Sequence, residues 1–336
     1  MTRDPDALVL VTGAGGFIGG HLVASLLEDG YRRVRAVDIK PPDHWFQRFP
    51  EAENLELDLR RREACQEAAR DVQWIYHLAA DMGGMGFIEF NRALCMLSVL
   101  IDTHLLEAAV EAGCERFFYS STACVYPEDK QLDPQNPGLR ESDTYPAMPE
   151  DGYGWQKLFS ERMCRHFRED FGLVTRVARY HNVYGELGTF DGGREKAPAA
   201  ICRKVATAVQ SGSHTIEIWG DGKQSRSFTY IEDCVAGTRL ITESEIEEPL
   251  NLGSDELVTI DELVDLVEEI AGIELTRHYD RTQPQGVRGR CSDNTLIREK
   301  LGWVPSTPLR EGMERTYRWI YDQLAGPRDL RRAFVE

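Results

Sequence analysis

The chain has 336 residues, of which 42% are hydrophobic and 28% are charged, and its formal net charge at pH 7 is −17. This composition indicates a soluble globular protein of one large domain or two ordinary ones. The acidic balance argues against a nucleic-acid surface, which needs a basic footprint, so we expect no nucleic-acid partner.

The N-terminal apolar run is too short to span a membrane and no small-residue cleavage site follows it, so we expect no membrane association. The eight cysteines include no CxxC pair, which argues against a disulfide framework or a zinc site. We therefore expect no bound metal and a reducing, cytoplasmic location.

Strand and helix patterns alternate from the start of the chain. Residues 7–13 (ALVLVTG) form a continuous apolar run, typical of a buried parallel strand, and a helix pattern follows at 16–27. Further patterns predict strands at 33–38, 54–58, 74–80, 116–121 and 175–180, and helices at 60–69, 91–112 and 153–171. This alternation predicts an α/β fold with a doubly wound parallel Rossmann sheet.

The stretch VTGAGGFIGGHL carries glycines in a GxxGxxG frame, directly after the first strand and at a helix start. Glycines there let the backbone approach a pyrophosphate at the helix N-terminus, so the sequence predicts a dinucleotide cofactor. The residues expected to contact it are Gly13, Gly16, Phe17, Ile18 and Gly19.

Two carboxylates at strand ends are further candidates for this cofactor site. Asp38 ends the second strand, where it can accept from a ribose 2′-hydroxyl and would repel a 2′-phosphate, which favours NAD over NADP. Asp58 ends the next strand and either meets the adenine or caps the following helix.

Beyond His181 the sequence pattern changes and indicates Gly-rich loops, short helices and short strands. We expect residues 1–182 to form the NAD-binding Rossmann domain, with a returning segment at about 223–253. Residues 183–222 and 254–336 are then a smaller α+β substrate-binding portion at the C-terminal side.

A tyrosine and a lysine stand four residues apart at the start of the 153–171 helix, so Tyr153 and Lys157 share one helix face. A phenol has an unperturbed pKa near ~10, and a neighbouring ammonium favours the phenolate, which suits proton transfer at a carbinol. Thr122, at the end of the preceding strand, is placed to hold the substrate hydroxyl. We expect Tyr153 and Lys157 to contact the cofactor as well.

These motifs, with WGDGKQSRSFTYIEDC further on, resemble the extended short-chain dehydrogenase/reductase family, which modifies nucleotide-sugars. Three stretches, DMGGMGF, SSTACVYPE and GGREKAPAAICRK, are similar to the subgroup that epimerises GDP-mannose at C3 and C5. The resemblance implies transient oxidation of C4 by NAD, epimerisation at C5 and C3, and re-reduction to GDP-L-galactose or GDP-L-gulose. The guanine base rests on the resemblance alone.

The resemblance implies that Cys124 and Lys196 are the base and the acid of epimerisation. Thiols ionise near ~8.5, within reach of activation by positive neighbours, although most free cysteines are small buried hydrophobes. Related dehydratases carry Asp-Glu where this chain has Ala123-Cys124, which speaks against dehydration.

Because the protein is acidic overall, a local group of lysines or arginines must bind the negatively charged substrate diphosphate. Arginine is well suited to phosphate oxygens. The stretch VRGR offers Arg288 and Arg290, of which we choose Arg288. The expected substrate contacts, from charge or from the resemblance, are Gly83, Thr122, Cys124, Asn182, Glu195, Lys196, Ala197, Lys204, Gln224, Arg226 and Arg288.

Relatives in this family commonly pair, so we expect a homodimer through the 91–112 helix and the Tyr153 helix. Three other functions remain open: a nucleotide-sugar 4-epimerase, a 3,5-epimerase of a modified GDP-sugar such as a heptose, and a non-catalytic NAD-binding sensor. Cys124 with Lys196 argues against the first, and the intact Thr122, Tyr153 and Lys157 argue against the last.

Overall fold

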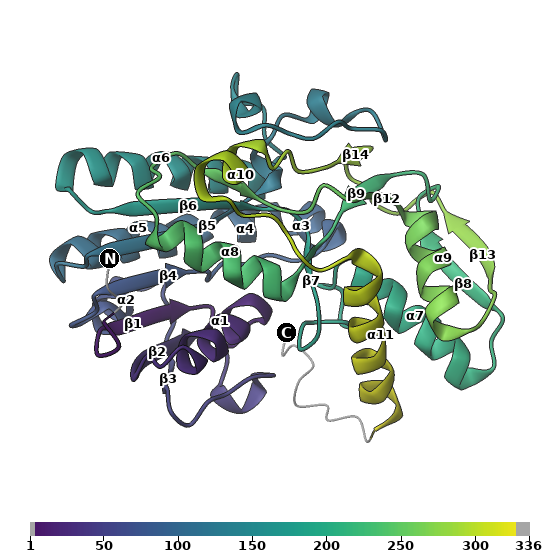
Figure 1. Cartoon of the computed structure of the whole chain (residues 1–336), viewed down its shortest axis with the longest axis horizontal. Helices are drawn as coiled ribbons and strands as arrows, with labels where there is room; N and C mark the ends of the chain where they lie inside the picture. The colour runs from purple at the N-terminus through teal and green to yellow at the C-terminus, as the bar shows by residue number, and fades with distance from the viewer. Residues whose placement is uncertain (1–3, 327–336) are drawn as a thin grey trace.

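The computed structural model describes residues 4–326, whose central unit is a seven-stranded parallel sheet in the order β11-β6-β5-β4-β1-β2-β3 (Figure 1). The α/β Rossmann fold expected from the sequence is therefore confirmed. The strands are β1 Leu8–Thr12, β2 Arg33–Asp38, β3 Glu53–Glu56, β4 Trp74–His77, β5 Arg116–Thr122, β6 Thr175–Tyr180 and β11 Leu250–Leu252.

Helices cover both faces of this sheet. One face packs against α1 and α8, and the other against α2, α5 and α6. Both faces of the central strands are consequently apolar, which explains why β1 and β4 read as continuous hydrophobic runs. The helices are α1 Phe17–Glu28, α2 Arg62–Ala69, α3 Met85–Phe90, α4 Arg92–Met96, α5 Ser98–Glu111, α6 Tyr153–Phe171 and α8 Ile231–Glu243.

Two predicted elements end elsewhere in the structure. The helix expected at 91–112 is divided into α4 and α5 by a turn at Leu97, whose backbone stays in the right-handed helical region. The strand expected at 74–80 stops at His77, because the next backbone N–H groups, of Leu78 and Ala79, donate to the Thr12 hydroxyl.

The stretch Arg92–Glu111, which spans α4 and α5, is long and apolar enough to cross a membrane by length and composition alone. However, 44% of its apolar window is buried inside the protein, and α5 packs against α2 and α6. A core helix of a soluble protein has the same properties, so this stretch is no argument for a membrane.

A second group of elements lies beside the sheet and belongs to the C-terminal half (Figure 1). Here α11 packs against α7 and α9, and β8 pairs with β13. The bounds are α7 Ala197–Ser211, β8 Thr215–Trp219, α9 Ile260–Ala271, β13 Thr276–Asp280 and α11 Leu309–Ala325. The helix α10, Thr295–Leu301, instead packs near β11 of the large sheet.

Short strands and turns connect the two groups. β9 pairs with β12 and β14, and β7 pairs with β10, while α8 and β11 return to the large sheet. The remaining elements are β7 Val183–Tyr184, β9 Ser225–Ser227, β10 Thr229–Tyr230, β12 Leu257–Thr259, β14 Gly289–Arg290, η1 Pro42–His44, η2 Ala123–Val125, η3 Glu128–Gln131 and η4 Glu141–Thr144.

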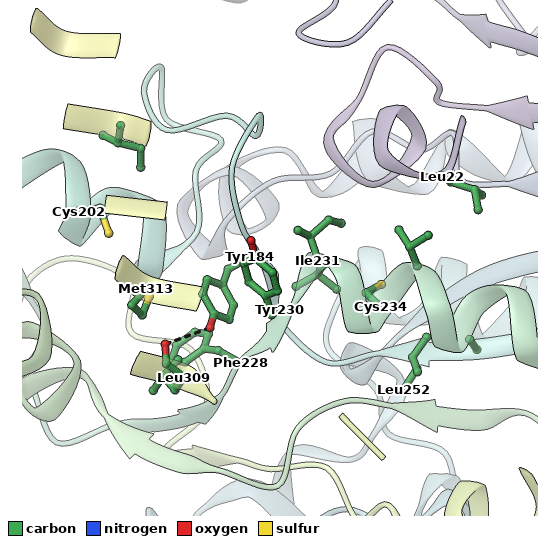
Figure 2. Close-up of a cluster of buried hydrophobic side chains, with 14 of the residues drawn as sticks. Leu22, Tyr184, Cys202, Phe228, Tyr230, Ile231, Cys234, Leu252, Leu309 and Met313 are labelled. Atoms are coloured by element: carbon green, nitrogen blue, oxygen red, sulfur yellow. Dashed lines mark hydrogen bonds between the residues drawn. The ribbon is translucent and has the colours of Figure 1, made fainter. Parts of the chain in front are cut away.

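One hydrophobic core runs through both groups of elements. Figure 2 shows Leu22 and Leu252 of the sheet side in the same cluster as Cys202 and Met313 of the other group. The ring of Tyr184 lies between them, 5.6 Å from the ring of Tyr230, and its hydroxyl donates to the Leu309 carbonyl at 3.3 Å. This shared core holds the two groups of elements in a fixed position relative to each other.

Candidate active site

A cavity of about 450 Å³ lies at the carboxyl ends of the sheet strands, where open α/β sheets bind ligands. Its lining comes from both groups of elements, since Lys196 and Ala199 join residues of the sheet side. All residues predicted to contact the cofactor line it: Gly13, Gly16, Phe17, Ile18, Gly19, Asp38, Asp58, Tyr153 and Lys157.

The glycine-rich turn fits a dinucleotide pyrophosphate. Gly13 has φ 70°, and a Cβ on Gly19 would lie 2.2 Å from the Gly13 carbonyl oxygen, so neither position accepts a side chain. The turn therefore presents bare backbone N–H groups at the N-terminus of α1, where an anion is stabilised.

Asp38 closes the adenosine end of this cavity. It ends β2, is 7% exposed, and accepts the backbone N–H of Lys40 at 3.0 Å. Burial raises the pKa of Asp38, and the charge of Lys40 counteracts it. The Lys40 ammonium donates to the Gly15 carbonyl at 2.6 Å, and a carboxylate at this position suits a free ribose hydroxyl, as in NAD.

An aromatic side chain covers the glycine turn from outside. The indole of Trp45 donates to the Lys40 carbonyl at 2.9 Å and packs so closely that a Cβ on Gly15 would lie 2.4 Å from its Nε1. The next residue, Phe46, lines the cavity and packs edge to face on Trp319 of α11, with ring centres 5.7 Å apart. We name Trp45, Phe46 and Trp319 the aromatic clamp.

Asp58 lines the cavity but does not cap α2, whose N-cap residue is Arg61. Its carboxylate instead accepts from the Arg60 guanidinium at 2.8 and 2.9 Å, and this hydrogen bonding lowers the pKa of Asp58. Of the two roles open for Asp58, the cap is therefore wrong, and contact with the adenine stays a prediction.

Tyr153 and Lys157 lie in the first turns of α6, with Thr122 at the end of β5 on the same cavity wall. The Lys157 ammonium donates to the Ser120 carbonyl at 2.8 Å and lies 5.9 Å from the centre of the Tyr153 ring. Burial raises the pKa of Tyr153 and lowers that of Lys157, so burial favours the neutral form of each group.

Asp102 of α5 is the charged centre of a buried network beneath this pair, which we name the Asp102 network. Burial would raise its pKa, but hydrogen bonds outweigh burial and the pKa is lowered, so Asp102 is a carboxylate. Its charge in turn favours the ammonium of Lys157. The network joins Asp102 to His77 at 2.7 Å, Tyr119 at 3.0 Å, Gln156 at 2.5 Å and Ser160 at 2.5 Å.

Cys124 lies in η2, directly after β5, and is 6% exposed. It packs against Tyr153 in a small apolar cluster, and its Sγ accepts from Arg290 Nη1 at 3.5 Å. Burial and then the Glu150 carboxylate raise the pKa of the thiol to about 11, against the opposing charge of Arg290. The thiol is therefore protonated at neutral pH, beside a cation that can stabilise its thiolate.

Lys196 stands at the N-cap of α7 and lines the cavity from the other group of elements. Burial lowers the pKa of its ammonium, while the charge of Cys124 as a thiolate would raise it. The preceding residues are held in place, since Gly84 N–H donates to the Arg194 carbonyl at 3.0 Å. The structure thus brings Lys196 toward Thr122 and Tyr153, as expected.

Several predicted substrate contacts surround Lys196 without lining this cavity. Gly83 precedes α3, Ala197 opens α7, and Glu195 pairs with Arg203 at 3.1 Å. Asn182 donates to the Ser227 carbonyl at 3.1 Å. Their roles toward a substrate stay predictions.

The predicted diphosphate contacts gather around β8, β9 and β14. Lys204 donates to the Glu217 carbonyl at 2.7 Å, and Gln224 donates to the Trp219 carbonyl at 3.1 Å. Arg226 is 9% exposed, and burial lowers its pKa to about 9.

The two arginines of VRGR have different surroundings. Arg288 is one-third exposed and pairs with Asp221 at 3.0 Å, so it stays available to a ligand at the surface. Arg290 is 4% exposed and is bound to Glu150, Gln131 and Cys124. Arg290 is therefore a buried, paired residue, and its carboxylate partner lies far away in the sequence.

Sequence analysis missed three residues that shape this site: Glu150, Gln131 and Asp102. A usable signal existed only for Asp102, which is a carboxylate between two apolar stretches of α5, residues 99–101 and 105–106. His181 is buried, its Nε2 lies 3.0 Å from the Asn251 side-chain oxygen, and burial lowers its pKa to about 3, so it is a packed neutral imidazole.

Comparisons with known proteins agree with this geometry. Residues 9–253 match the model of the NAD dependent epimerase/dehydratase family. The chain is 46% identical over 317 residues to GDP-mannose 3,5-epimerase 1 of Oryza sativa subsp. indica, covering 94% of this chain and 82% of the relative.

Two solved structures share the fold over nearly their whole length. UDP-glucose 4-epimerase from Thermotoga maritima with UDP-glucose has a TM-score of 0.84 at 28% identity, covering 94% of this chain and 99% of that one. UDP-glucuronic acid 4-epimerase from Bacillus cereus, in complex with UDP-glucuronic acid and NAD, has a TM-score of 0.79 at 26% identity, covering 94% and 99%.

Proposed function

Because the chain belongs to the NAD-dependent epimerase/dehydratase family, we propose that it is a nucleotide-sugar epimerase that inverts C5 and C3 of GDP-mannose. The expected products are GDP-L-gulose and GDP-L-galactose. One observation carries this proposal: Thr122, Tyr153 and Lys157 share a cavity with Lys196, while Cys124 packs against Tyr153. The site therefore holds two acid–base groups beyond those that a C4 step needs.

The first step concerns C4 of the sugar. Thr122 holds the C4 hydroxyl and Tyr153 takes its proton, with the Lys157 ammonium stabilising the phenolate. When bound, NAD accepts the hydride from C4 and later returns it. The charge of the buried Asp102 carboxylate counteracts the lowering of the Lys157 pKa by burial and so favours the ammonium that this role needs.

The second step concerns the carbons beside the C4 ketone, whose C–H bonds are acidified because the carbanion is an enolate. Cys124 removes the proton from one face of the ring, and Lys196 delivers a proton to the other. Inversion needs both groups, because a residue that returns a proton to its own face regenerates the starting sugar. A 4-epimerase needs neither group, and this distinguishes the proposal from the solved relatives described above.

The test is incubation of the holoenzyme with a panel of GDP- and UDP-sugars in D₂O, with products analysed by NMR and mass spectrometry. We expect deuterium at C5 and C3 of products from GDP-mannose. Inversion at C4 without deuterium at C5 would assign the chain to the 4-epimerases. Turnover of only a modified GDP-sugar would keep the chemistry and change the substrate.

We also propose that the protein is a homodimer through α5 and α6. Both helices expose large apolar side chains, including Leu100 at 40% and Phe159 at 56%. Exposure of this kind on adjacent elements is typical of a protein interface. The neighbouring residues that extend the same apolar set are Phe90, Met96, Leu97 and Trp155.

A further inference from the structure

A closed ring of buried contacts surrounds Cys124. Arg290 Nη1 donates to the sulfur at 3.5 Å, Arg290 Nε donates to Gln131 Oε1 at 2.6 Å, and Arg290 Nη2 donates to a carboxylate oxygen of Glu150. The backbone N–H of Glu150 donates to the Cys124 carbonyl at 3.0 Å, which closes the ring. Glu150 therefore touches the cysteine twice, once directly and once through Arg290.

The position of Arg290 depends on this ring. A buried guanidinium is costly unless it is paired and hydrogen-bonded, and Glu150 and Arg290 are both 4% exposed. Each of the three guanidinium nitrogens has an acceptor inside the protein, so the rigid fork is aimed by Glu150 and Gln131. Gln131 is itself anchored, because its amide donates to the Tyr126 and Pro127 carbonyls at 3.1 Å each.

We propose that Glu150 is a positioning residue for the epimerisation step: it holds Arg290 against the Cys124 sulfur and balances the charge of that arginine. This inference rests on the proposed role of Cys124 as the base. Without Glu150, the charge of Arg290 would oppose burial alone and would lower the pKa of the thiol. With Glu150 present, the resting group is a thiol and the guanidinium is already in place when the proton leaves.

The electrostatics around the sulfur agree with this balance. Burial is the largest cause that raises the pKa of the thiol, Glu150 raises it further and Arg290 lowers it, and the resulting pKa is about 11. The charged or titratable groups that face Cys124 come from five elements or loops: Glu150, Tyr153, Lys196, Arg226 and Arg290.

The decisive variant is Glu150→Gln, which removes the negative charge but keeps an amide oxygen for Arg290. The thiol pKa should fall by about one to three units, because removal of the like charge of Glu150 leaves the opposite charge of Arg290 to act on the thiol unopposed. The measurement is the pH titration of ultraviolet thiolate absorbance of the holoenzyme, as a difference from the same protein carrying Cys124→Ser. This reading needs no sugar, so it stands or falls separately from the proposed substrate.

A matched control is Glu161→Gln. Glu161 and Arg179 form a comparable buried pair, with Oε2 and Nη2 2.7 Å apart, on α6 and β6. This variant should leave the thiol midpoint unchanged. An unchanged midpoint in Glu150→Gln, or an equal shift in Glu161→Gln, would overturn the proposal.

Glu150→Asp gives a second test if the glutamine variant does not fold. It keeps the charge but shortens the side chain by one methylene, so the guanidinium withdraws from the sulfur. Misplacement on this scale is expected to lower kcat for C5 deuterium exchange by about a hundredfold, with KM unchanged. A raised KM with unchanged kcat would show instead that Arg290 binds the diphosphate, and would refute the positioning role.

Discussion

At the scale of single residues, Tyr153 and Cys124 lie in one apolar cluster, and burial affects the pKa of both in the same direction. Burial raises the pKa of both groups, so neither is a base in isolation. Each group has a buried cation nearby that favours its ionised form: Lys157 lies near the phenol ring and Arg290 near the sulfur. Each cation is in turn balanced by a buried carboxylate, Asp102 for Lys157 and Glu150 for Arg290.

Isotope exchange can distinguish the role of Cys124 from that of Lys196. Cys124→Ala should show neither exchange at C5 nor inversion, because the base is absent. Lys196→Ala should still exchange the substrate proton with solvent deuterium through Cys124, but without inverted product. The measurement is deuterium content at C5 and C3 of recovered substrate and product. Tyr153→Phe serves as the control that blocks both, and full inversion by Cys124→Ala would return that cysteine to a structural role.

The pH dependence of the two events should also differ. The thiol pKa lies at about 11, so the thiolate fraction, and with it C5 exchange, should rise with pH from neutral into alkaline solution. Burial lowers the pKa of Lys196, so its ammonium is lost earlier than in an ordinary lysine. The ratio of inverted to exchanged sugar should therefore fall as pH rises. A constant ratio across this range would contradict Lys196 as the proton donor.

Local motifs made these residues predictable, whereas their partners were not. Tyr153 and Lys157 are four residues apart, and Cys124 follows Thr122 by two, so spacing alone brings each pair together. Glu150 and Arg290 are 140 residues apart, and no local pattern indicates that they meet. The roles of the site residues toward a substrate stay predictions, because geometry without a ligand does not test them.

At the scale of elements, the Asp102 network joins α5, β4, β5 and α6 through one carboxylate. Its contact His77 continues to Thr12 at 2.8 Å, the last residue of β1 before the glycine turn. The same carboxylate therefore holds the helix that carries Tyr153 and the strand that leads into the cofactor site. Movement of α5 would disturb both.

Asp102→Asn should lower the free energy of unfolding by about 3 kcal/mol, because it places an amide N–H₂ among buried donors. The folded-state pKa of Asp102 is lowered, so its contribution is present above the unfolded value near ~3.9 and is lost as pH falls through the folded value. Urea unfolding of the holoenzyme at fixed NAD concentration measures this. Glu169→Gln, at an exposed pair with Arg165, should change it little at any pH.

The aromatic clamp joins the 39–49 loop to α11 across the cofactor cavity. Phe46→Ala should speed release of NAD at least several-fold, because the packing of Phe46 on Trp319 closes the cavity mouth. The measurement is the rate at which purified holoenzyme loses NAD into a trapping enzyme. Phe171→Ala, at an exposed ring of α6 remote from the cavity lining, is the control. Equal rates of NAD release from the two variants would show that the aromatic clamp does not retain the cofactor.

At the scale of the whole molecule, the exposed apolar surface of α5 and α6 leads to a prediction about assembly. Phe159→Glu combined with Leu100→Glu should convert a dimer into a monomer, because charges in an apolar interface lose their hydration without a partner. Light scattering at micromolar concentration measures this. Phe171→Glu, on the same helix α6 but outside the apolar set, should leave the dimer intact. A monomeric wild-type protein would refute the proposed interface.

Most of the large sheet was predictable from the sequence because strand patterns, such as the apolar run of β1, alternate with helix patterns along the N-terminal half of the chain. The edge strand β11 was expected only as part of a returning segment. The family resemblance drawn from the glycine turn, the Tyr153 pair and the downstream motifs is confirmed by the family match. The C-terminal group was only described in outline, because strands such as β9 and β14 have two or three residues and pair across 60 or more positions. Patterns that short carry no period from which to predict them.

Residues of both groups enclose the cofactor cavity, and this affects how individual enzyme molecules become inactive. A cycle that oxidises and then reduces the same sugar leaves the enzyme as it began, independent of the redox state of the cell. If the ketone escapes before the hydride returns, that molecule is left in the reduced state. Recovery then requires exchange of the reduced cofactor for dissolved dinucleotide through a cavity that both groups of elements line. The working lifetime of such an enzyme is therefore counted in turnovers, and it is set by the competition between hydride return and ketone escape.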